Sequence, residues 1–112
     1  MLLVPPGGTT TVSGGELDLN CNDLVIQGTL VLAGGSIVGA RDVLIDGGSI
    51  DAGGNSISFS RDWSNTGSFT PSSSTVRLVD GCGSSTARIL GSTTFNNFEA
   101  SSTTGRQLEL ES

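Results

Sequence analysis

Two cysteines, Cys21 and Cys82, have the most specific chemistry of any residues in this 112-residue chain. An even number of cysteines in an exported protein indicates a disulfide. Cys82 lies in a Gly-Cys-Gly sequence, where the backbone bends freely. We therefore predict a disulfide between Cys21 and Cys82. The alternative is two free thiols, with Cys21 buried and Cys82 exposed.

Three aspartates, Asp23, Asp42 and Asp62, recur at nearly equal spacing along the sequence. In a fold that repeats at this spacing they would form a column of carboxylates about 5 Å apart, which could bind Ca²⁺. However, Arg41 and Arg61 directly precede two of the aspartates, and the glycine-rich nonapeptide of calcium-binding β-helices is absent. We predict charge neutralisation and turn formation at these positions, with no metal site.

Paired carboxylates about 5–9.5 Å apart would be suited to glycosidic bond hydrolysis. The candidate pairs are Asp46 with Asp51, and Asp18 with Asp42, although nothing in the sequence marks any of them as buried. The chain has no His and no Lys, which excludes an imidazole base and a Schiff base. We predict no enzymatic activity, no catalytic residue and no cofactor.

The single tryptophan, Trp63, is the best candidate for a ligand-binding side chain. With Phe69 it would form an exposed aromatic platform for a sugar ring, and the neighbouring Asp62 and Asn65 would bind hydroxyl groups. The alternative places Trp63 in the core or against a loop, as is common for a lone tryptophan.

The net charge of −6 results from 5 Arg against 11 Asp and Glu. Proteins that bind nucleic acids or anionic membranes usually carry a basic patch, which this composition does not favour. No apolar run approaches the roughly 18 residues that a membrane span requires. We therefore predict neither nucleic-acid binding nor membrane insertion.

An internal repeat must position these side chains. Residues 23–28 match residues 42–47 closely and residues 62–67 more loosely, and the same offset carries residues 36–41 onto residues 56–61. Apolar and polar residues alternate within each repeat, which indicates β-strands. Pairs of glycines separate the strands and favour tight turns. No stretch of ten residues has helical periodicity.

A period of 19–20 residues with short strands and glycine corners predicts an all-β fold, a single-stranded parallel β-solenoid (β-helix) of about five coils. Residues 1–112 would form a single β-solenoid domain, which we take to be a fragment of a longer protein. An antiparallel β-sandwich is the alternative, because strands spaced 8–12 residues apart are also typical of that fold.

The solenoid constrains the predicted disulfide. Cys21 and Cys82 are three coils apart, a rise of about 14 Å in a straight stack. A disulfide requires Cα atoms about 4.4–6.8 Å apart. Residues 80–86 interrupt the repeat as an insertion. We predict that this insertion folds back along the rod as a staple and brings Cys82 to Cys21.

Residues 15–21, 62–69, 74–83 and 89–98 carry a recognisable pattern, in which Trp-Ser-Asn-x-Gly-x-Phe is followed by Thr-Val-x-Leu and Thr-Thr-Phe-x-Asn. In this pattern the chain resembles a β-helix repeat segment of large exported bacterial surface (adhesin-like) proteins, which often carry a C-terminal sorting tail. The resemblance implies an extracellular or cell-surface location and a scaffold role. It implies no catalytic or ligand-binding residues.

The sequence thus predicts a structural segment of an exported bacterial surface or adhesin-like protein. A carbohydrate-binding module is the alternative, and a polysaccharide-active enzyme is a weaker one. The expected partners are other segments of the parent protein and, for the alternative, a glycan. We also expect self-association through the C-terminal coil, because residues 107–112 alternate apolar and polar or acidic residues without a capping element.

Overall fold

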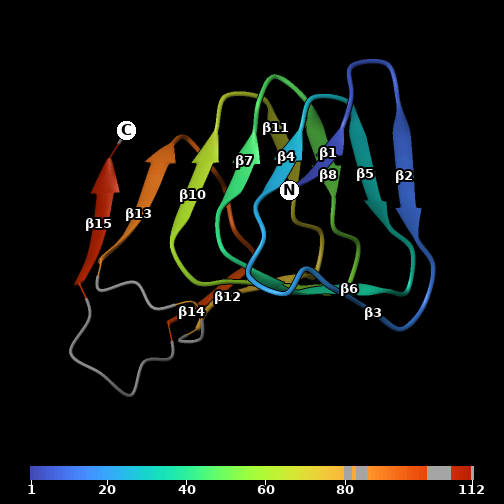
Figure 1. Ribbon diagram of the computed structural model, residues 1–112. Helices are drawn as coiled ribbons and strands as arrows, with labels where there is room; N and C mark the ends of the chain where they lie inside the picture. The colour runs from blue at the N-terminus through green and yellow to red at the C-terminus, as the bar shows by residue number, and fades with distance from the viewer. Residues whose placement is uncertain (80–81, 83–85, 101–106, 112) are drawn as a thin grey trace.

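The chain folds into three parallel β-sheets that wind around a common core (Figure 1). The computed structural model describes residues 1–79, 82, 86–100 and 107–111, the last of these through their backbone. Sheet A contains, in spatial order, β1 (Leu2–Val4), β4 (Leu24–Ile26), β7 (Val43–Ile45), β10 (Asp62–Asn65), β13 (Thr86–Gly91) and β15 (Gln107–Glu111). Sheet B contains β2 (Thr9–Val12), β5 (Thr29–Leu32), β8 (Ser49–Asp51) and β11 (Ser68–Thr70). Sheet C contains β3 (Glu16–Asp18), β6 (Ser36–Ala40), β9 (Ser56–Phe59), β12 (Thr75–Leu78) and β14 (Asn97–Ala100).

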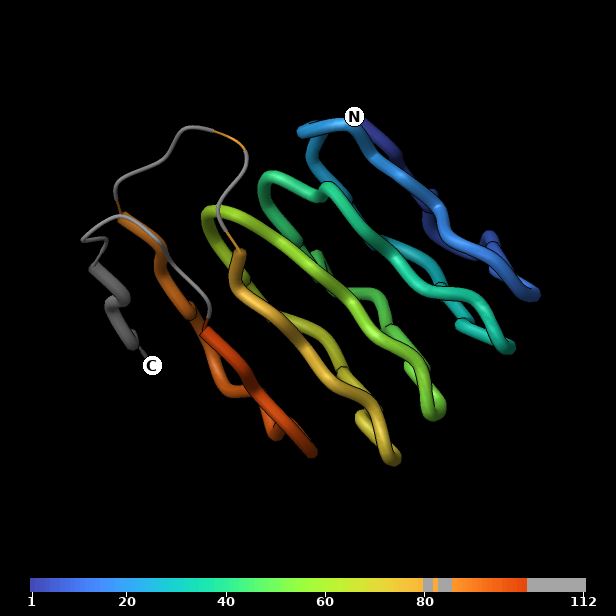
Figure 2. The backbone as a smooth tube through the Cα atoms, turned by 90° about the horizontal axis from the view of Figure 1, so that it is seen from below, coloured from blue at the N-terminus to red at the C-terminus, as the bar shows by residue number. Residues whose placement is uncertain are grey.

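Each strand pairs with the strand one coil away, and every pairing among the described residues is parallel. Figure 2 shows the successive coils side by side along the solenoid. Val43 pairs with Leu24 on one side and with Trp63 on the other, so each coil advances the sequence by one repeat. The predicted parallel β-solenoid of about five coils is therefore confirmed, and the antiparallel sandwich is wrong.

None of the described residues belongs to a helix of the length and apolar character needed to cross a membrane.

The core runs along the centre of the solenoid because strand alternation turns the same positions inward in every coil. Ile26 pairs with Ile45 in sheet A, and Ile37 pairs with Ile57 in sheet C. Burial of one such side chain contributes about 1.5–3 kcal/mol. The sequence repeat thus becomes a continuous stack of apolar side chains, whose buried members include Val4, Leu24, Ile26, Leu30, Ile37, Val43, Ile45, Ile50, Ile57, Phe59, Trp63, Val76 and Ile89.

A column of glycines, Gly28, Gly48 and Gly67, forms the corner between sheets A and B. The backbones of adjacent coils touch here: the N–H of Ser49 donates to the carbonyl of Gly28 at 2.9 Å, and the N–H of Ser68 donates to the carbonyl of Gly48 at 3.0 Å. A Cβ atom on Gly48 would collide with the carbonyl oxygen of Gly28. The repeated glycine therefore permits the close approach of the coils at this corner.

The five aromatic side chains of the chain form one cluster toward the C-terminal end of the core. The ring of Trp63 lies 5.1 Å from that of Phe69 and 5.4 Å from that of Phe95, and Phe95 lies 5.0 Å from Phe98. Phe59 completes the cluster at 5.7 Å from Trp63. In the fifth coil (coil 5), which begins with β13, residues 92–96 form no strand in sheet B, and the ring of Phe95 packs into the core from this segment.

Candidate functional site

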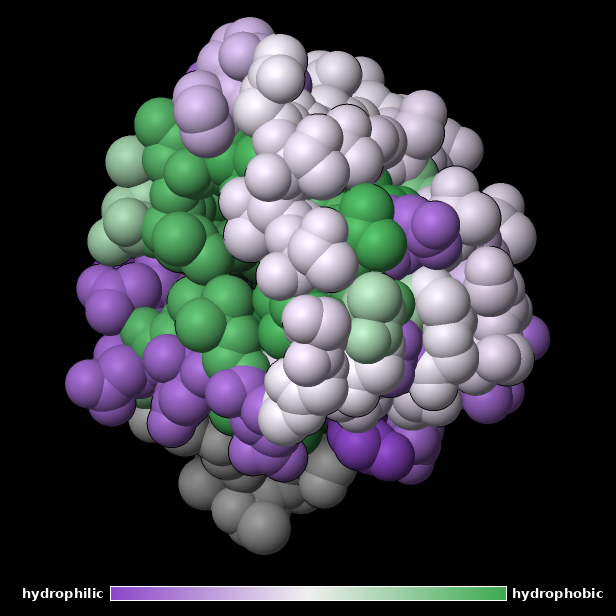
Figure 3. Space-filling view, turned by 90° about the vertical axis from the view of Figure 1, so that its right-hand side faces the viewer, coloured by the Kyte–Doolittle hydropathy of each residue, from purple (hydrophilic) through white to green (hydrophobic). Residues whose placement is uncertain are grey.

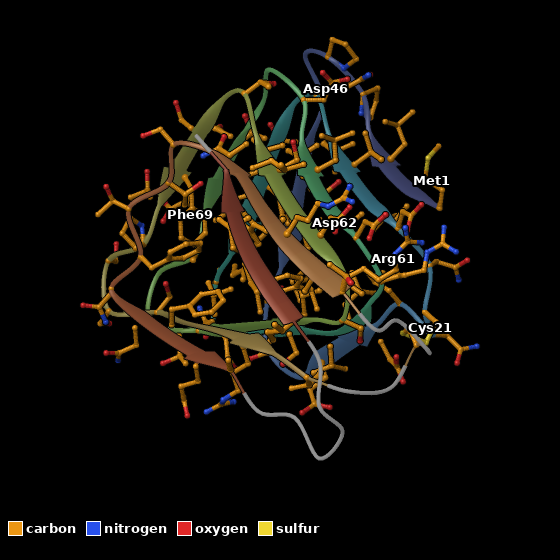
Figure 4. All side chains as sticks on the ribbon, turned by 90° about the vertical axis from the view of Figure 1, so that its left-hand side faces the viewer. Met1, Cys21, Asp46, Arg61, Asp62 and Phe69 are labelled. Atoms are coloured by element: carbon orange, nitrogen blue, oxygen red, sulfur yellow. A yellow bond between two sulfur atoms is a disulfide. The ribbon has the colours of Figure 1, made fainter. Side chains whose placement is uncertain are left out.

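The corner between sheets C and A carries most of the residues singled out for chemistry. Asp23 and Asp42 immediately precede β4 and β7, and Asp62 is the first residue of β10. Since these strands are adjacent in sheet A, the three aspartates occupy the same corner in successive coils. Figure 4 shows Arg61 and Asp62 near one another at this corner, with Cys21 further along it.

The aspartates are tied to arginines and to the backbone of the next coil. Arg41 donates two hydrogen bonds to the carboxylate of Asp23, both at 3.0 Å, and Arg61 lies 3.6 Å from Asp42. The Oδ1 atom of Asp42 accepts the N–H of Asp62 at 3.1 Å. Each arginine of these pairs thus links to the aspartate one coil back. The predicted charge neutralisation is therefore present, whereas the hydrogen bonds of these two carboxylates join coils and do not form turns.

The series of hydrogen bonds from one coil to the aspartate of the preceding coil continues into the fifth coil, so that each of the three carboxylates accepts at least one hydrogen bond. Oδ1 of Asp62 accepts the N–H of Arg88 at 3.2 Å. Among the residues that the structure describes, no group of three or more acidic or cysteine side chains is placed to hold a metal ion. The geometry of this corner therefore fits a structural role for the carboxylates.

The pKa values of two of the aspartates shift in opposite directions. The hydrogen bond from Arg41 is the main cause that lowers the pKa of Asp23 below its ordinary value. Burial is the main cause that raises the pKa of Asp42, against the opposing effects of the Asp62 N–H and of Arg61. Asp23 and Asp42 occupy the same repeat position, but ionisation of Asp23 favours the folded state, whereas ionisation of Asp42 disfavours it.

This difference predicts opposite pH dependence for the variants Asp23→Asn and Asp42→Asn. The contribution of Asp23 is present above its unfolded-state pKa and is lost as the pH falls through its folded-state pKa, because its folded pKa is the lower one. The contribution of Asp42 to stability is fully present below its unfolded-state pKa. It is lost as the pH rises through its folded-state pKa, because its folded pKa is the higher one. Asp23→Asn should therefore be less stable than wild type at pH 7 but not at acid pH.

Urea unfolding of both variants at neutral and acid pH measures this contrast. Asp42→Asn should gain stability relative to wild type as the pH rises, because the amide oxygen still accepts the N–H of Asp62 and no half-buried carboxylate ionises at this position. Equal losses for both variants at pH 7, with the same pH dependence, would contradict the assignment.

Cys21 and Cys82 form the predicted disulfide, with their Cα atoms 5.6 Å apart. Cys82 follows β12 in the long connection to β13, and the register between β10 and β13 pairs Trp63 with Ile89, a longer step than in the earlier coils. Cys82, which lies within the insertion that the sequence indicated, is therefore bonded to the first coil, as predicted. The remaining residues of this insertion, 80–81 and 83–85, lie outside the described residues.

The backbone around Cys21 adopts an uncommon conformation. Asn20 and Cys21 have φ angles of 53° and 64°, in the left-handed region that favours glycine. The N–H of Cys21 donates to the carbonyl of Gly39 at 2.7 Å, and the N–H of Asn20 donates to Oδ1 of Asp18 at 2.9 Å. These bonds hold the turn that presents Cys21. The sequence analysis missed Gly39 and Asn20, for which the only signal is an Asp-x-Asn turn pattern.

A groove of ≈ 410 Å³ runs along this corner beside the disulfide. It is lined by residues of four successive coils, among them Asp18, Val38, Ser58 and Val79, together with both cysteines. Neither cysteine belongs to the buried hydrophobic cluster, Cys21 is exposed and Cys82 is half-buried. The disulfide therefore crosses the outside of the coil stack.

Trp63 lies in the core and not on the surface. Its side chain is fully buried, and its Nε1 atom donates to Oγ1 of Thr93 at 3.1 Å. Asn65 is also buried; it donates to the same hydroxyl at 3.0 Å and accepts the N–H of Gly67 at 2.9 Å. Trp63 therefore offers no ring face to a sugar, and the predicted group of Trp63, Asp62 and Asn65 forms no surface platform.

The other candidate carboxylates have local partners. Asp46 accepts a hydrogen bond from the side chain of Gln27 in the preceding coil at 3.0 Å. Asp51 accepts the N–H of Gly53 at 3.3 Å, and Asp18 accepts that of Asn20. These contacts shape turns or join coils, which is the ordinary use of aspartate at such positions.

The first coil presents apolar side chains on its open side (Figure 3). Leu2, Val12 and Leu17 are half-buried against the core, and Leu3 is 42 % exposed.

The self-association predicted through the C-terminal coil concerns the opposite end, where β15 is the last strand of sheet A. The side chains of residues 107–112 lie outside the described residues, so that interaction stays a prediction.

The described residues thus form a disulfide across the coils, hydrogen-bonded Asp–Arg pairs between coils and a buried tryptophan. Comparison with protein-family models, with curated proteins and with solved structures finds no match to this chain.

Proposed function

We propose that this chain is a structural β-solenoid segment of an exported bacterial surface protein of the adhesin-like kind. The observation that carries the proposal is the Cys21–Cys82 disulfide. Disulfides persist in oxidising environments outside the cytosol and are rare within it. The resemblance of residues 62–69 and 89–98 to surface-protein repeats supports the same location.

The mechanism of such a segment is mechanical spacing. Parallel pairing of strands in all three sheets makes the coils a continuous hydrogen-bonded stack, with apolar side chains on the inside. In repeat proteins of this kind each coil contacts only its neighbours, so a stack lengthens without any change in its cross-section. The segment therefore holds the parts that flank it at a distance, and its tightly paired backbone resists proteolysis.

Immunolabelling of the bacterium that produces the protein tests this location. An antibody against the folded segment should label intact cells without permeabilisation. Alkylation of the same cells before and after reduction should find Cys21 and Cys82 oxidised in place. Labelling only after permeabilisation, with both thiols free, would contradict the proposal.

A glycan array separates the structural role from the carbohydrate-binding alternative. Because Trp63 is fully buried, we expect no binding by the wild type that depends on an exposed ring at this position. The matched variant Trp63→Phe keeps an aromatic side chain in the cluster and serves as the control. Saturable binding of one glycan class by the wild type, lost in Asp62→Ala while the fold persists, would favour a binding module.

A further inference from the structure

The disulfide divides the chain into a part that it encloses and two parts that it leaves outside. Cys21 lies between β3 and β4, and Cys82 lies between β12 and β13. The nine strands β4 to β12 are therefore enclosed, while β1 to β3 and β13 to β15 lie outside. We infer that this disulfide is a clasp on the outside of the coil stack, which a small thiol opens without unfolding the solenoid and which limits how far the chain extends under tension. This inference concerns the fold alone and goes beyond the proposed location.

The path of a pulling force shows what the clasp does. Tension applied at the two ends of the chain reaches Cys21, crosses the sulfur–sulfur bond to Cys82, and bypasses every residue between them. The outer strands that must detach from the enclosed ones under load are then β1, β2 and β3, which pair with β4, β5 and β6, and β13 and β14, which pair with β10 and β12. While the bond is closed, the enclosed strands β4 to β12 lie outside the covalent path of the force.

The position of the disulfide leaves it open to a thiol in solution. Cys21 is an exposed residue, Cys82 is half-buried, and the groove beside them is ≈ 410 Å³ in volume. Neither sulfur fills space in the core, so cleavage of the bond opens no cavity there. The clasp therefore differs from a buried disulfide, which a thiol reaches only after unfolding.

Opening follows ordinary thiol–disulfide exchange. A thiolate of a dithiol such as dithiothreitol attacks Sγ of Cys21, the Cys21–Cys82 bond breaks, and its electron pair leaves on Sγ of Cys82 as a thiolate. The second thiol of the reagent then attacks the mixed disulfide and releases Cys21. The protein gains two electrons and two protons overall, and the dithiol is oxidised to its cyclic disulfide.

The turn that presents Cys21 is held by contacts that do not involve sulfur. The N–H of Cys21 donates to the carbonyl of Gly39 in the next coil, and the N–H of Asn20 donates to the carboxylate of Asp18. These hydrogen bonds keep Asn20 and Cys21 in their left-handed conformation after the disulfide opens. The thiol of Cys21 thus stays in position, and the clasp closes again under oxidising conditions.

Single-molecule pulling of the full chain between handles at its two ends tests whether the clasp limits the extension of the chain. The enclosed segment spans 61 residue steps, which correspond to roughly 210 Å of extended chain. The oxidised protein should unfold with a contour length shorter by this amount than the same protein in dithiothreitol. The variant Cys21→Ser/Cys82→Ser should reach the full length with or without the reductant. Full extension of the oxidised wild type would overturn the inference.

Bulk reduction tests whether the clasp opens in the folded state. Dithiothreitol should reduce the native protein at a rate of the same order as the guanidinium-unfolded protein, and the β-sheet circular dichroism should persist. Oxidised glutathione should then restore the disulfide and the shorter contour length. Reduction limited by the rate of global unfolding, or loss of the circular dichroism signal with the disulfide, would refute an external clasp.

Discussion

Replacing Cys21 and Cys82 by serine is expected to lower the free energy of unfolding by about 4 kcal/mol. The disulfide closes a loop of 61 residue steps, and in the chain-entropy account a loop of this length greatly restricts the unfolded chain. Domains of this size are usually stable by only about 5–15 kcal/mol, so the loss is a large part of the total. The solenoid itself should persist, because its core contains neither sulfur.

Urea unfolding monitored by circular dichroism measures this loss. Reduced wild type should match the double variant in unfolding midpoint, because both lack the cross-link, and a reducing agent should leave the double variant unchanged. If the oxidised protein and the double variant unfold at the same urea concentration, the disulfide does not restrict the unfolded chain as described.

Replacing Gly48 by alanine is expected to destabilise the protein by about 3 kcal/mol. The new Cβ would collide with the carbonyl oxygens of Gly28 and Ile26 in the preceding coil, and these are backbone atoms that cannot rotate away. Relief requires the two coils to separate, which weakens the hydrogen bond from Ser49 to Gly28. The neighbouring pairs of β5 with β8 and of β4 with β7 should weaken with it.

Gly54→Ala is the matched control for this substitution. Like Gly48, Gly54 does not have the positive φ that disfavours a side chain, and a Cβ there meets only the hydroxyl of Ser73 at 3.0 Å. That hydroxyl can turn aside, so Gly54→Ala should stay close to wild type in urea unfolding. A loss at Gly54 as large as the loss at Gly48 would show that backbone entropy and not the contact between coils governs these glycines.

The sequence by itself determined the architecture and the register. Its repeat places like residues one coil apart, so that the match of residues 23–28 to residues 42–47 became the parallel pairing of β4 with β7. The sequence also indicated that Arg41 and Arg61 neutralise the aspartates, but it did not indicate that each pairs with the aspartate one coil back, as Arg41 does with Asp23. A repeat converts sequence periodicity directly into contacts, because every coil meets its neighbour in the same way.

The tertiary structure decided the features that depend on breaks in the repeat. Between β10 and β13 the register runs from Trp63 to Ile89, further than one repeat, and Cys82, which lies within this longer step, has its Cα atom 5.6 Å from that of Cys21. Likewise, the burial of Trp63 depends on Thr93 and Phe95, which come from a segment of coil 5 that has no strand in sheet B. Such contacts join residues at unequal offsets, so periodicity carries no information about them, and only the packing of the folded chain selects them.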